Sequence, residues 1–270
     1  QHKVAEALGI GFHQVSVQVR RMGGAFGGKE RQANLPAIIA ALAAVKTGKP
    51  AKLVYDRDED MRVTGKRHDF QISYDVGFTN DGKILALNVE QFLRCGMSFD
   101  LSAAIADRAM MHAENAYFIP DMRVTASLCK THTPSNTAFR GFGGPQGIMG
   151  MERVIDDIAA ILGLDPLIVR QRNFYPDKDA SDGGKPTPYG QPVTDCIIGQ
   201  LADKLARDAH YHERRKEIVK WNEGHPILRR GIALTPVKFG ISFNKTMLNQ
   251  AGALVQVQDG QGGEPFDPFR

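Results

Sequence analysis

The sequence predicts an α+β fold, because strand patterns and helical runs occur without a regular strand–helix–strand repeat. The clearest strand signal is a long β-hairpin, in which hydrophobic residues alternate over 70–78 and again over 85–89. A turn sequence at 80–82, Asn-Asp-Gly, separates the two runs. The clearest helix signal covers 146–162, and Gly163 is placed to end it.

Local patterns predict the other elements of the first third of the chain. In chain order they are a helix at 2–8 that Gly9 ends, a half-buried strand at 15–19, a helix at 32–46, a short strand at 51–55 and a charged loop from there to Arg67. The strand at 15–19 leads into a glycine-rich stretch, and the helix at 32–46 follows it.

The rest of the chain continues this mixture. The expected elements are a helix that carries Arg108 after a cap at Asp100 or Ser102, a strand at 122–130, a helix from Pro166 capped by Asp165, helices at 194–207 and up to Trp221, and strands at 232–234 and 254–257. The proline- and glycine-rich stretch 179–192 is the best linker candidate. We therefore expect most of a first domain at 1–178 and the truncated start of a second at 193–270.

Composition excludes several classes of protein. The chain has 270 residues, of which 42% are hydrophobic and 24% charged, as in globular proteins. No run of eighteen apolar residues exists, and no Lys/Arg run marks a nucleic-acid surface, so we expect neither membrane nor nucleic acid as a partner. Three distant cysteines support neither a zinc nor an iron–sulfur site and favour a reducing, cytoplasmic setting. The first residue is Gln1 rather than Met, which suggests a fragment.

Two glycine-rich loops are the candidate functional sites. The first loop, 21–30, reads Arg-Met-Gly-Gly-Ala-Phe-Gly-Gly-Lys-Glu, and the second loop, 139–146, reads Phe-Arg-Gly-Phe-Gly-Gly-Pro-Gln. Glycine at this density lets backbone N–H groups approach an anionic ligand, although tight packing at a turn explains either loop alone equally well. The first loop satisfies the P-loop spacing, but Glu30 stands where Ser or Thr must hold Mg²⁺. Neither loop contains the dinucleotide-binding motif.

Both loops resemble the molybdopterin-binding subunit of the xanthine dehydrogenase family, which includes aldehyde oxidases and carbon monoxide dehydrogenases. The similarity extends to 55–61, 135–138, 238–243 and 248–254, and runs from residue 1 to about 257. It identifies the chain as an internal fragment of that subunit and implies part of a two-domain molybdopterin-binding region.

The resemblance implies a molybdenum hydroxylase that uses oxygen from water. The molybdenum is held by the dithiolene of the pterin and not by protein side chains. Two electrons leave through 2Fe-2S clusters to FAD, which the family carries on other domains or subunits, and the full assembly is a dimer. The implied reaction belongs to purine catabolism and takes hypoxanthine to xanthine and then to urate.

The resemblance also assigns roles to residues. The backbone at Phe26 and Gly27, and that at Arg140, would face the molybdenum centre. Glu30 would hydrogen-bond the purine and support proton movement on it. Arg108 would stabilise the negative charge that develops on the heterocycle. Read without the family, Glu30 is an acidic residue near a helix start and Arg108 a surface residue.

The remaining implied contacts concern the flat face of the substrate. Phe142 and Phe243 would sandwich the purine, whereas both would otherwise be read as core residues. Asn244 stands where the family usually places a substrate-contacting Thr. The pair Glu30 and Arg108 favours a purine over an aldehyde, because aldehyde oxidases tend to lack it.

The sequence departs from the family at its ends. The family's general-base glutamate lies beyond Arg270, a glutamine of the molybdenum centre lies before Gln1, and the tail 260–270 does not follow the family. We therefore expect the chain alone to be inactive. Two alternatives stay open: an aldehyde or other N-heterocycle hydroxylase of the same family, or a cofactor-free truncated module that only packs against partner subunits.

Overall fold

The computed structural model describes residues 1–176 and 184–243. The chain divides into two units, Gln1–Gly240 and Ile241–Arg270, and all elements below belong to the first. The strand expected at 254–257 and the residue Asn244 lie outside the described residues. The expected division into a first domain at 1–178, a linker at 179–192 and a second domain at 193–270 stays a prediction.

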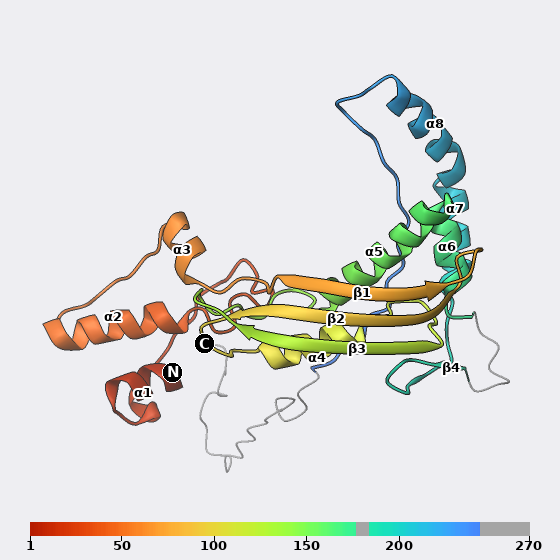
Figure 1. Ribbon diagram of the computed structural model, residues 1–270. Helices are drawn as coiled ribbons and strands as arrows, with labels where there is room; N and C mark the ends of the chain where they lie inside the picture. Colours follow the sequence, from red (N-terminus) through yellow and green to blue (C-terminus); the bar gives the residue numbers. More distant parts are fainter. Residues whose placement is uncertain (177–183, 244–270) are drawn as a thin grey trace, which may run out of the picture. The chain divides into compact units, whose positions relative to one another are not determined.

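A three-stranded mixed sheet is the centre of the first unit (Figure 1). Its strands are β1 (Phe70–Phe78), β2 (Ile84–Gly96) and β3 (Asp121–Lys130), with β2 in the middle. β1 and β2 are antiparallel, which confirms the predicted hairpin. Its turn closes with a 2.9 Å hydrogen bond from the Thr79 amide to the Lys83 carbonyl, and Gly82 takes a positive φ of 89°.

Helix α4 (Ser102–Met111) connects β2 to β3, which run parallel with Ala86 opposite Asp121. A parallel pair needs such a crossover, because its strands start at the same edge of the sheet. Helix α5 (Gly144–Leu162) packs against β1 and against α4. Together, α4 and α5 cover one face of the sheet, as Figure 1 shows.

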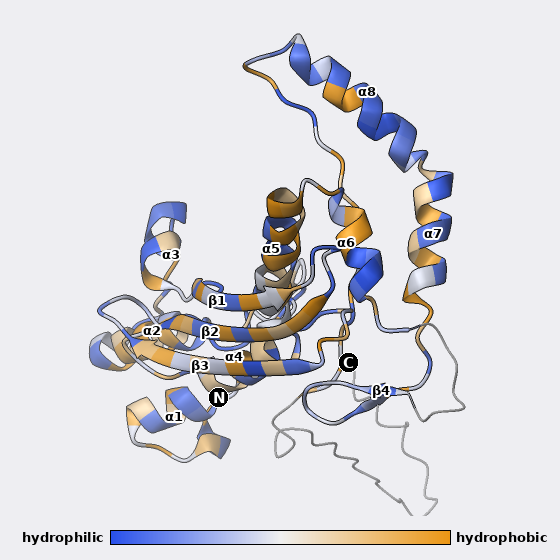
Figure 2. Ribbon diagram, turned by 45° about the vertical axis from the view of Figure 1, so that its right-hand side comes forward, coloured by the Kyte–Doolittle hydropathy of each residue, from blue (hydrophilic) through white to orange (hydrophobic). Residues whose placement is uncertain are grey.

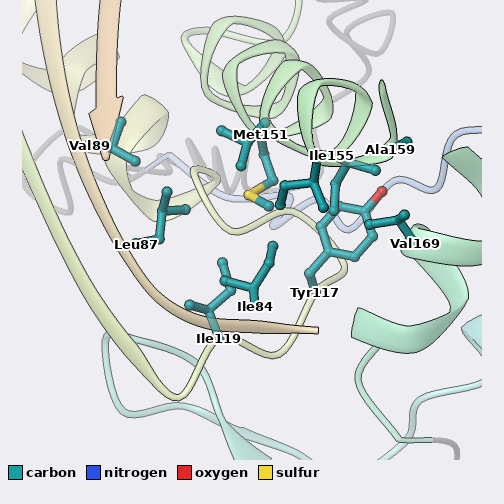
Figure 3. Close-up of a cluster of buried hydrophobic side chains, with 11 residues drawn as sticks. Ile84, Leu87, Val89, Tyr117, Ile119, Met151, Ile155, Ala159 and Val169 are labelled. Carbon is teal, nitrogen blue, oxygen red and sulfur yellow. The ribbon is translucent and has the colours of Figure 1, made fainter. Parts of the chain in front are cut away.

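The main hydrophobic core lies between α5 and this face of the sheet. Figure 3 shows Met151 and Ile155 of α5 directed toward Ile84 and Leu87 of β2, with the Tyr117 ring beside them. Helix α5 is largely hydrophobic in Figure 2, and its buried residues include Met151, Val154, Ile155 and Ile158. The helix ends at Gly163, as the sequence predicts, with a left-handed φ of 66°. The α+β fold is therefore confirmed.

Helix α6 (Pro166–Asn173) contributes a buried cation to this core. The Asp165 carboxylate caps α6 by accepting a 2.8 Å hydrogen bond from the Leu167 amide, as predicted. Arg170 is only 2% exposed and forms ion pairs with Glu152 at 2.8 Å and Asp156 at 2.9 Å, both on α5. A buried guanidinium needs such partners, because its desolvation is otherwise uncompensated.

The other elements of the described ranges are short or peripheral. They are α1 (His2–Leu8), a 3₁₀ turn at Phe12–Gln14, α2 (Asn34–Thr47), α3 (Arg57–Val63), β4 (Lys185–Pro186), β5 (Pro192–Val193), α7 (Ile198–Asp208) and α8 (Tyr211–Glu223). Helix α2 is apolar around its circumference and none of its residues is buried. Within the described residues, α1 is its neighbour.

Several local predictions were wrong. No strand forms at 15–19, 51–55 or 232–234 of the described chain, because no neighbouring strand there pairs with these segments. The alternation at 232–234 instead reflects packing of Ile232 and Leu234 against buried residues of α6, α7 and α8. The expected charged loop after Tyr55 contains α3, whose start is a capping box formed by Asp56 and Glu59.

The predicted cap of α4 was also wrong. Leu101 occupies the N-cap position, and no side chain caps the helix. The Asp100 carboxylate accepts hydrogen bonds from the Leu101 amide at 2.8 Å and from the Thr137 hydroxyl at 2.9 Å. Asp100 therefore ties the start of α4 to the segment that leads into the second loop.

Candidate functional site

The two glycine-rich loops lie in contact. A Cβ atom on Gly27 of the first loop would come within 3.3 Å of the Ala138 carbonyl carbon, just before the second loop. A Cβ atom on Gly28 would come within 3.0 Å of the Phe139 ring. Larger residues would force the loops apart, so the glycines permit this close approach. The sequence-based expectation that the loops converge agrees with this geometry.

Each loop holds one phenylalanine in a left-handed conformation. Phe26 and Phe142 both have φ of 49°. This region is unfavourable for a bulky residue and costs about 1–3 kcal/mol unless the surroundings impose it. In the second loop the surroundings include hydrogen bonds from the Phe142 amide to the Phe139 carbonyl at 2.7 Å and from the Gly144 amide to the Gly141 carbonyl at 2.9 Å. Strain of this kind is typical of ligand-binding loops.

Two arginines lie against aromatic rings at the contact between the loops. The Arg140 guanidinium lies 5.8 Å from the centre of the Phe26 ring, which is itself more than half exposed. The Arg67 guanidinium donates a 2.6 Å hydrogen bond to the Arg140 carbonyl and lies 5.0 Å from the Phe139 ring. Burial lowers the pKa of Arg67, yet a guanidinium stays charged at neutral pH. The contact region is therefore cationic.

Arg108 and Phe142 lie together although 34 positions separate them in the sequence. Arg108 is 6% exposed, on α4, and its guanidinium carbon lies 5.9 Å from the Phe142 ring centre. Its Nη1 donates a hydrogen bond to the Gly240 carbonyl. Burial lowers the pKa of Arg108 without discharging it at neutral pH. Read without the family resemblance, the sequence predicts Arg108 at the surface, and that prediction was wrong.

A close approach of α4 and α5 produces this arrangement. A Cβ atom on Gly143, the N-cap of α5, would lie 2.1 Å from the Ile105 carbonyl oxygen of α4. A Cβ atom on Gly147 would lie 2.2 Å from the Ala109 carbonyl oxygen. Two glycines thus let the second loop reach the helix that carries Arg108.

The segment 236–240 packs on the C-terminal part of α4 and the turn that follows. Side chains there bind its backbone at alternate residues: Asn115 Nδ2 donates to the Pro236 carbonyl at 2.9 Å, Asn115 Oδ1 accepts from the Lys238 amide at 3.0 Å, and His112 Nε2 accepts from the Gly240 amide at 3.0 Å. The Lys238 ammonium also donates to the buried Glu114 carboxylate. Burial raises the pKa of Glu114, and Lys238 opposes that shift.

Sequence reasoning did not assign a role to His112, Arg67 or Phe239. The Phe239 ring lies 4.6 Å from the His112 ring and 5.4 Å from the Arg108 guanidinium carbon. The spacing of Arg108 and His112, four residues apart on a helix, was a signal for a shared face. No local pattern relates either residue to position 240.

Glu30 of the first loop is not among the residues whose contacts with Arg108 are described above. Glu30 is exposed on the first loop, and its carboxylate has no hydrogen-bond or ion-pair partner among the described residues; its amide donates to the Gly27 carbonyl at 3.0 Å. Phe243 belongs to the second unit. The roles of Glu30, Arg108, Phe26, Gly27, Arg140, Phe142, Phe243 and Asn244 stay predictions.

The profile of the molybdopterin cofactor-binding domain matches residues 1–174, which include both glycine loops, α4 and α5. The chain belongs to this family. The resemblance found in the sequence is thereby confirmed, and the chain corresponds to one part of the longer proteins that it matches.

Relatives of this molybdopterin cofactor-binding domain include two xanthine dehydrogenases. It is 43% identical to the xanthine dehydrogenase/oxidase of Felis catus over 257 residues, which are 95% of this chain and 19% of the relative. It is 42% identical to the xanthine dehydrogenase of Dictyostelium discoideum over 94% of this chain and 18% of the relative. The chain thus spans about a fifth of the length of these relatives.

A solved structure has the same fold as this molybdopterin cofactor-binding domain. The aldehyde oxidoreductase of Desulfovibrio desulfuricans aligns with a TM-score of 0.67 and 27% sequence identity, over 80% of this chain and 23% of that one. The mixed arrangement of helices and strands is therefore the fold of molybdopterin-binding domains in this family.

The contact between the two loops fits an anionic cofactor. In the described ranges no three His, Cys, Asp or Glu side chains gather where they could hold a metal ion. The loop contact instead offers closely approaching backbone and the exposed cation Arg140. None of the helices described is both long and apolar enough to span a bilayer.

Proposed function

We propose that this chain forms part of the molybdenum site of a full-length hydroxylase that oxidises purines, hypoxanthine to xanthine and then to urate. The buried Arg108 guanidinium beside the Phe142 ring carries the proposal. A fixed cation next to an aromatic face suits a flat heterocycle on which negative charge develops. The similarity to xanthine dehydrogenases supports a purine as substrate.

The first and second loops would hold the cofactor. Phe26 and Gly27 present backbone where the loops meet, and Arg140 adds positive charge that suits the phosphate of molybdopterin. When bound, the cofactor supplies the two-electron oxidation chemistry. The close packing of Gly27 against Ala138 restricts the backbone of the first loop there. Preorganised groups of this kind need no rearrangement during reaction.

Arg108, Phe142, Phe243 and Glu30 would act on the substrate. Arg108 stabilises the negative charge on the heterocycle, and Phe142 packs against one face of the ring. Phe243 and Asn244 would complete the substrate contacts. Glu30, with its carboxylate exposed, would accept a hydrogen bond from the purine and hold a proton on it.

The remaining parts of the reaction would lie outside this chain. We propose that the general-base glutamate, the 2Fe-2S clusters and FAD belong to other domains or subunits, that the full assembly is a cytoplasmic dimer, and that the chain alone is inactive. We also propose the domain division at 1–178, 179–192 and 193–270. Xanthine-dependent dye reduction by the isolated chain would contradict the inactivity.

The test uses the full-length protein that contains this chain. Molybdenum analysis first establishes whether the protein carries the metal, and its absence would favour a cofactor-free assembly module. Glu30→Ala should lower kcat/KM for xanthine about 100-fold, because the substrate loses the carboxylate that would hydrogen-bond it. Glu217→Ala, an exposed carboxylate on α8, is the matched control and should change nothing. Equal kcat/KM values for both variants would refute the proposed role of Glu30. A preference for aldehydes over purines in a substrate panel would refute the proposal that the substrate is a purine.

A further inference from the structure

The His112 ring closes a triangle of hydrogen bonds that includes Arg108. Its Nδ1 lies 2.8 Å from the Arg108 carbonyl oxygen, and its Nε2 lies 3.0 Å from the Gly240 amide nitrogen. The third side is the hydrogen bond from Arg108 Nη1 to the Gly240 carbonyl. The amide of Gly240 is therefore bound by His112, the C-cap residue of α4, and its carbonyl by Arg108 of α4.

The partners of His112 fix its tautomer. A carbonyl oxygen only accepts, so Nδ1 must carry the proton that is donated to Arg108. A backbone amide only donates, so Nε2 must be the unprotonated acceptor for Gly240. One neutral tautomer satisfies both bonds, and the doubly protonated ring satisfies only one.

The surroundings of His112 maintain this neutral form. The ring is 5% exposed and lies against the Phe239 ring, and a Cβ atom on Gly144 would come within 2.4 Å of that phenylalanine. The charged groups that act on it are Arg108 on its own helix and Lys238 on the packed segment, which is paired with Glu114. Two cations and an apolar ring oppose a third positive charge.

We propose that His112 is a positioning residue that holds the Gly240 peptide and, through it, aims the Arg108 guanidinium at the substrate. A long arginine side chain has many rotamers, and a fixed carbonyl acceptor removes most of them. The catalytic part of this inference rests on the proposed function. The hydrogen-bonded triangle is independent of it.

Two variants separate the parts of the His112 ring. His112→Phe keeps an aromatic ring against Phe239 and removes both hydrogen bonds. His112→Gln keeps an acceptor that reaches the position of Nε2, so it should restore the bond to Gly240. Tyr74→Phe is the matched control, because it removes one aromatic hydrogen bond, to Asp157, far along the chain from this segment.

The first experiment needs no catalysis. Nuclear magnetic resonance of the 270-residue chain reports hydrogen exchange of the Gly240 amide and of the Arg108 side-chain N–H groups. In His112→Phe both should exchange about tenfold faster, as for the loss of a net hydrogen bond. In His112→Gln and Tyr74→Phe they should stay within about twofold of the unmodified chain. Unchanged exchange in His112→Phe would overturn the triangle.

The second experiment uses the full-length protein with its cofactor and xanthine. His112→Phe should lower kcat about tenfold with KM within about twofold, because the Arg108 charge acts in the transition state. His112→Gln should recover most of kcat. Faster exchange in His112→Phe with unchanged kcat would overturn the positioning role. If the unmodified protein does not turn over xanthine, the purine function is refuted. Hydrogen exchange of the Arg108 and Gly240 N–H groups would still test the hydrogen bonds among Arg108, His112 and Gly240.

Discussion

Gly143→Ala tests whether the contact of α4 with α5 builds the site. Gly143 is the N-cap of α5 and directly follows Phe142, whose ring lies beside Arg108. A Cβ atom there would lie 2.1 Å from the Ile105 carbonyl oxygen, whereas ordinary contact begins at 3.4 Å. The N-terminus of α5 must therefore move by about 1.3 Å or the chain must absorb the overlap as strain.

Gly163→Ala is the matched control at the other end of the same helix. Both glycines have a positive φ, 96° at Gly143 and 66° at Gly163, so alanine is strained at both. That strain costs about 1 kcal/mol. Around Gly163 no atom lies within 4 Å of the added Cβ, so no further cost is expected there. At Gly143 the overlap adds about 1–3 kcal/mol, as other overpacked sites do.

Urea unfolding of the 270-residue chain, followed by circular dichroism, measures this difference. The free energy of unfolding should fall by about 1 kcal/mol in Gly163→Ala and by about 2–4 kcal/mol in Gly143→Ala. The full-length Gly143→Ala protein should also lose kcat for xanthine, because Phe142 and Arg108 separate. Equal destabilisation by both substitutions would refute the close approach of α4 and α5.

Three further predictions concern charge and exposed surface. Arg170→Met should destabilise the chain by about 3 kcal/mol, because it leaves the partly buried Glu152 without its cation. Arg153→Met on the exposed side of α5 should cost less than about 0.5 kcal/mol, and thermal unfolding compares the two variants. Burial lowers the pKa of His112, so the neutral ring contributes fully to stability at pH values above its ordinary pKa of 6.5. This contribution is lost as the pH falls through the lowered pKa of the folded protein. Hydrogen exchange of the Gly240 amide should therefore accelerate only at acidic pH. Val45→Lys on the exposed apolar helix α2 should change the free energy of unfolding by less than about 0.5 kcal/mol, as measured by thermal unfolding. A large loss of stability would show that Val45 is not exposed.

Elements whose signals are local could be predicted from the sequence. The β1–β2 hairpin follows from alternation and a turn sequence, and α5 and α6 follow from Gly163 and Asp165 at their ends. The segment 15–19 has the same alternation as β1 but no partner strand in the described chain, and a strand needs a partner for its backbone groups. Helix α3 was missed although its capping box was readable.

The sequence predicted the part of the candidate site where glycines let two loops approach each other closely. The two loops were expected to converge, and the Gly27 and Gly28 contacts with 138–139 agree. The burial of Arg108 was not predictable from its charged neighbourhood on α4, because the segment that covers it arrives 132 positions later. The tautomer of His112 depends on the same long-range contact.

The kinetics of Arg108→Leu in the full-length, molybdenum-loaded protein test the central claim most directly. We expect kcat/KM for xanthine to fall about 100- to 1,000-fold, as for the loss of a preorganised electrostatic group. We expect kcat/KM for a small aldehyde, on which no heterocyclic charge develops, to change less than about threefold. Equal losses for both substrates, or no loss for xanthine, would contradict the assignment of Arg108 to purine chemistry.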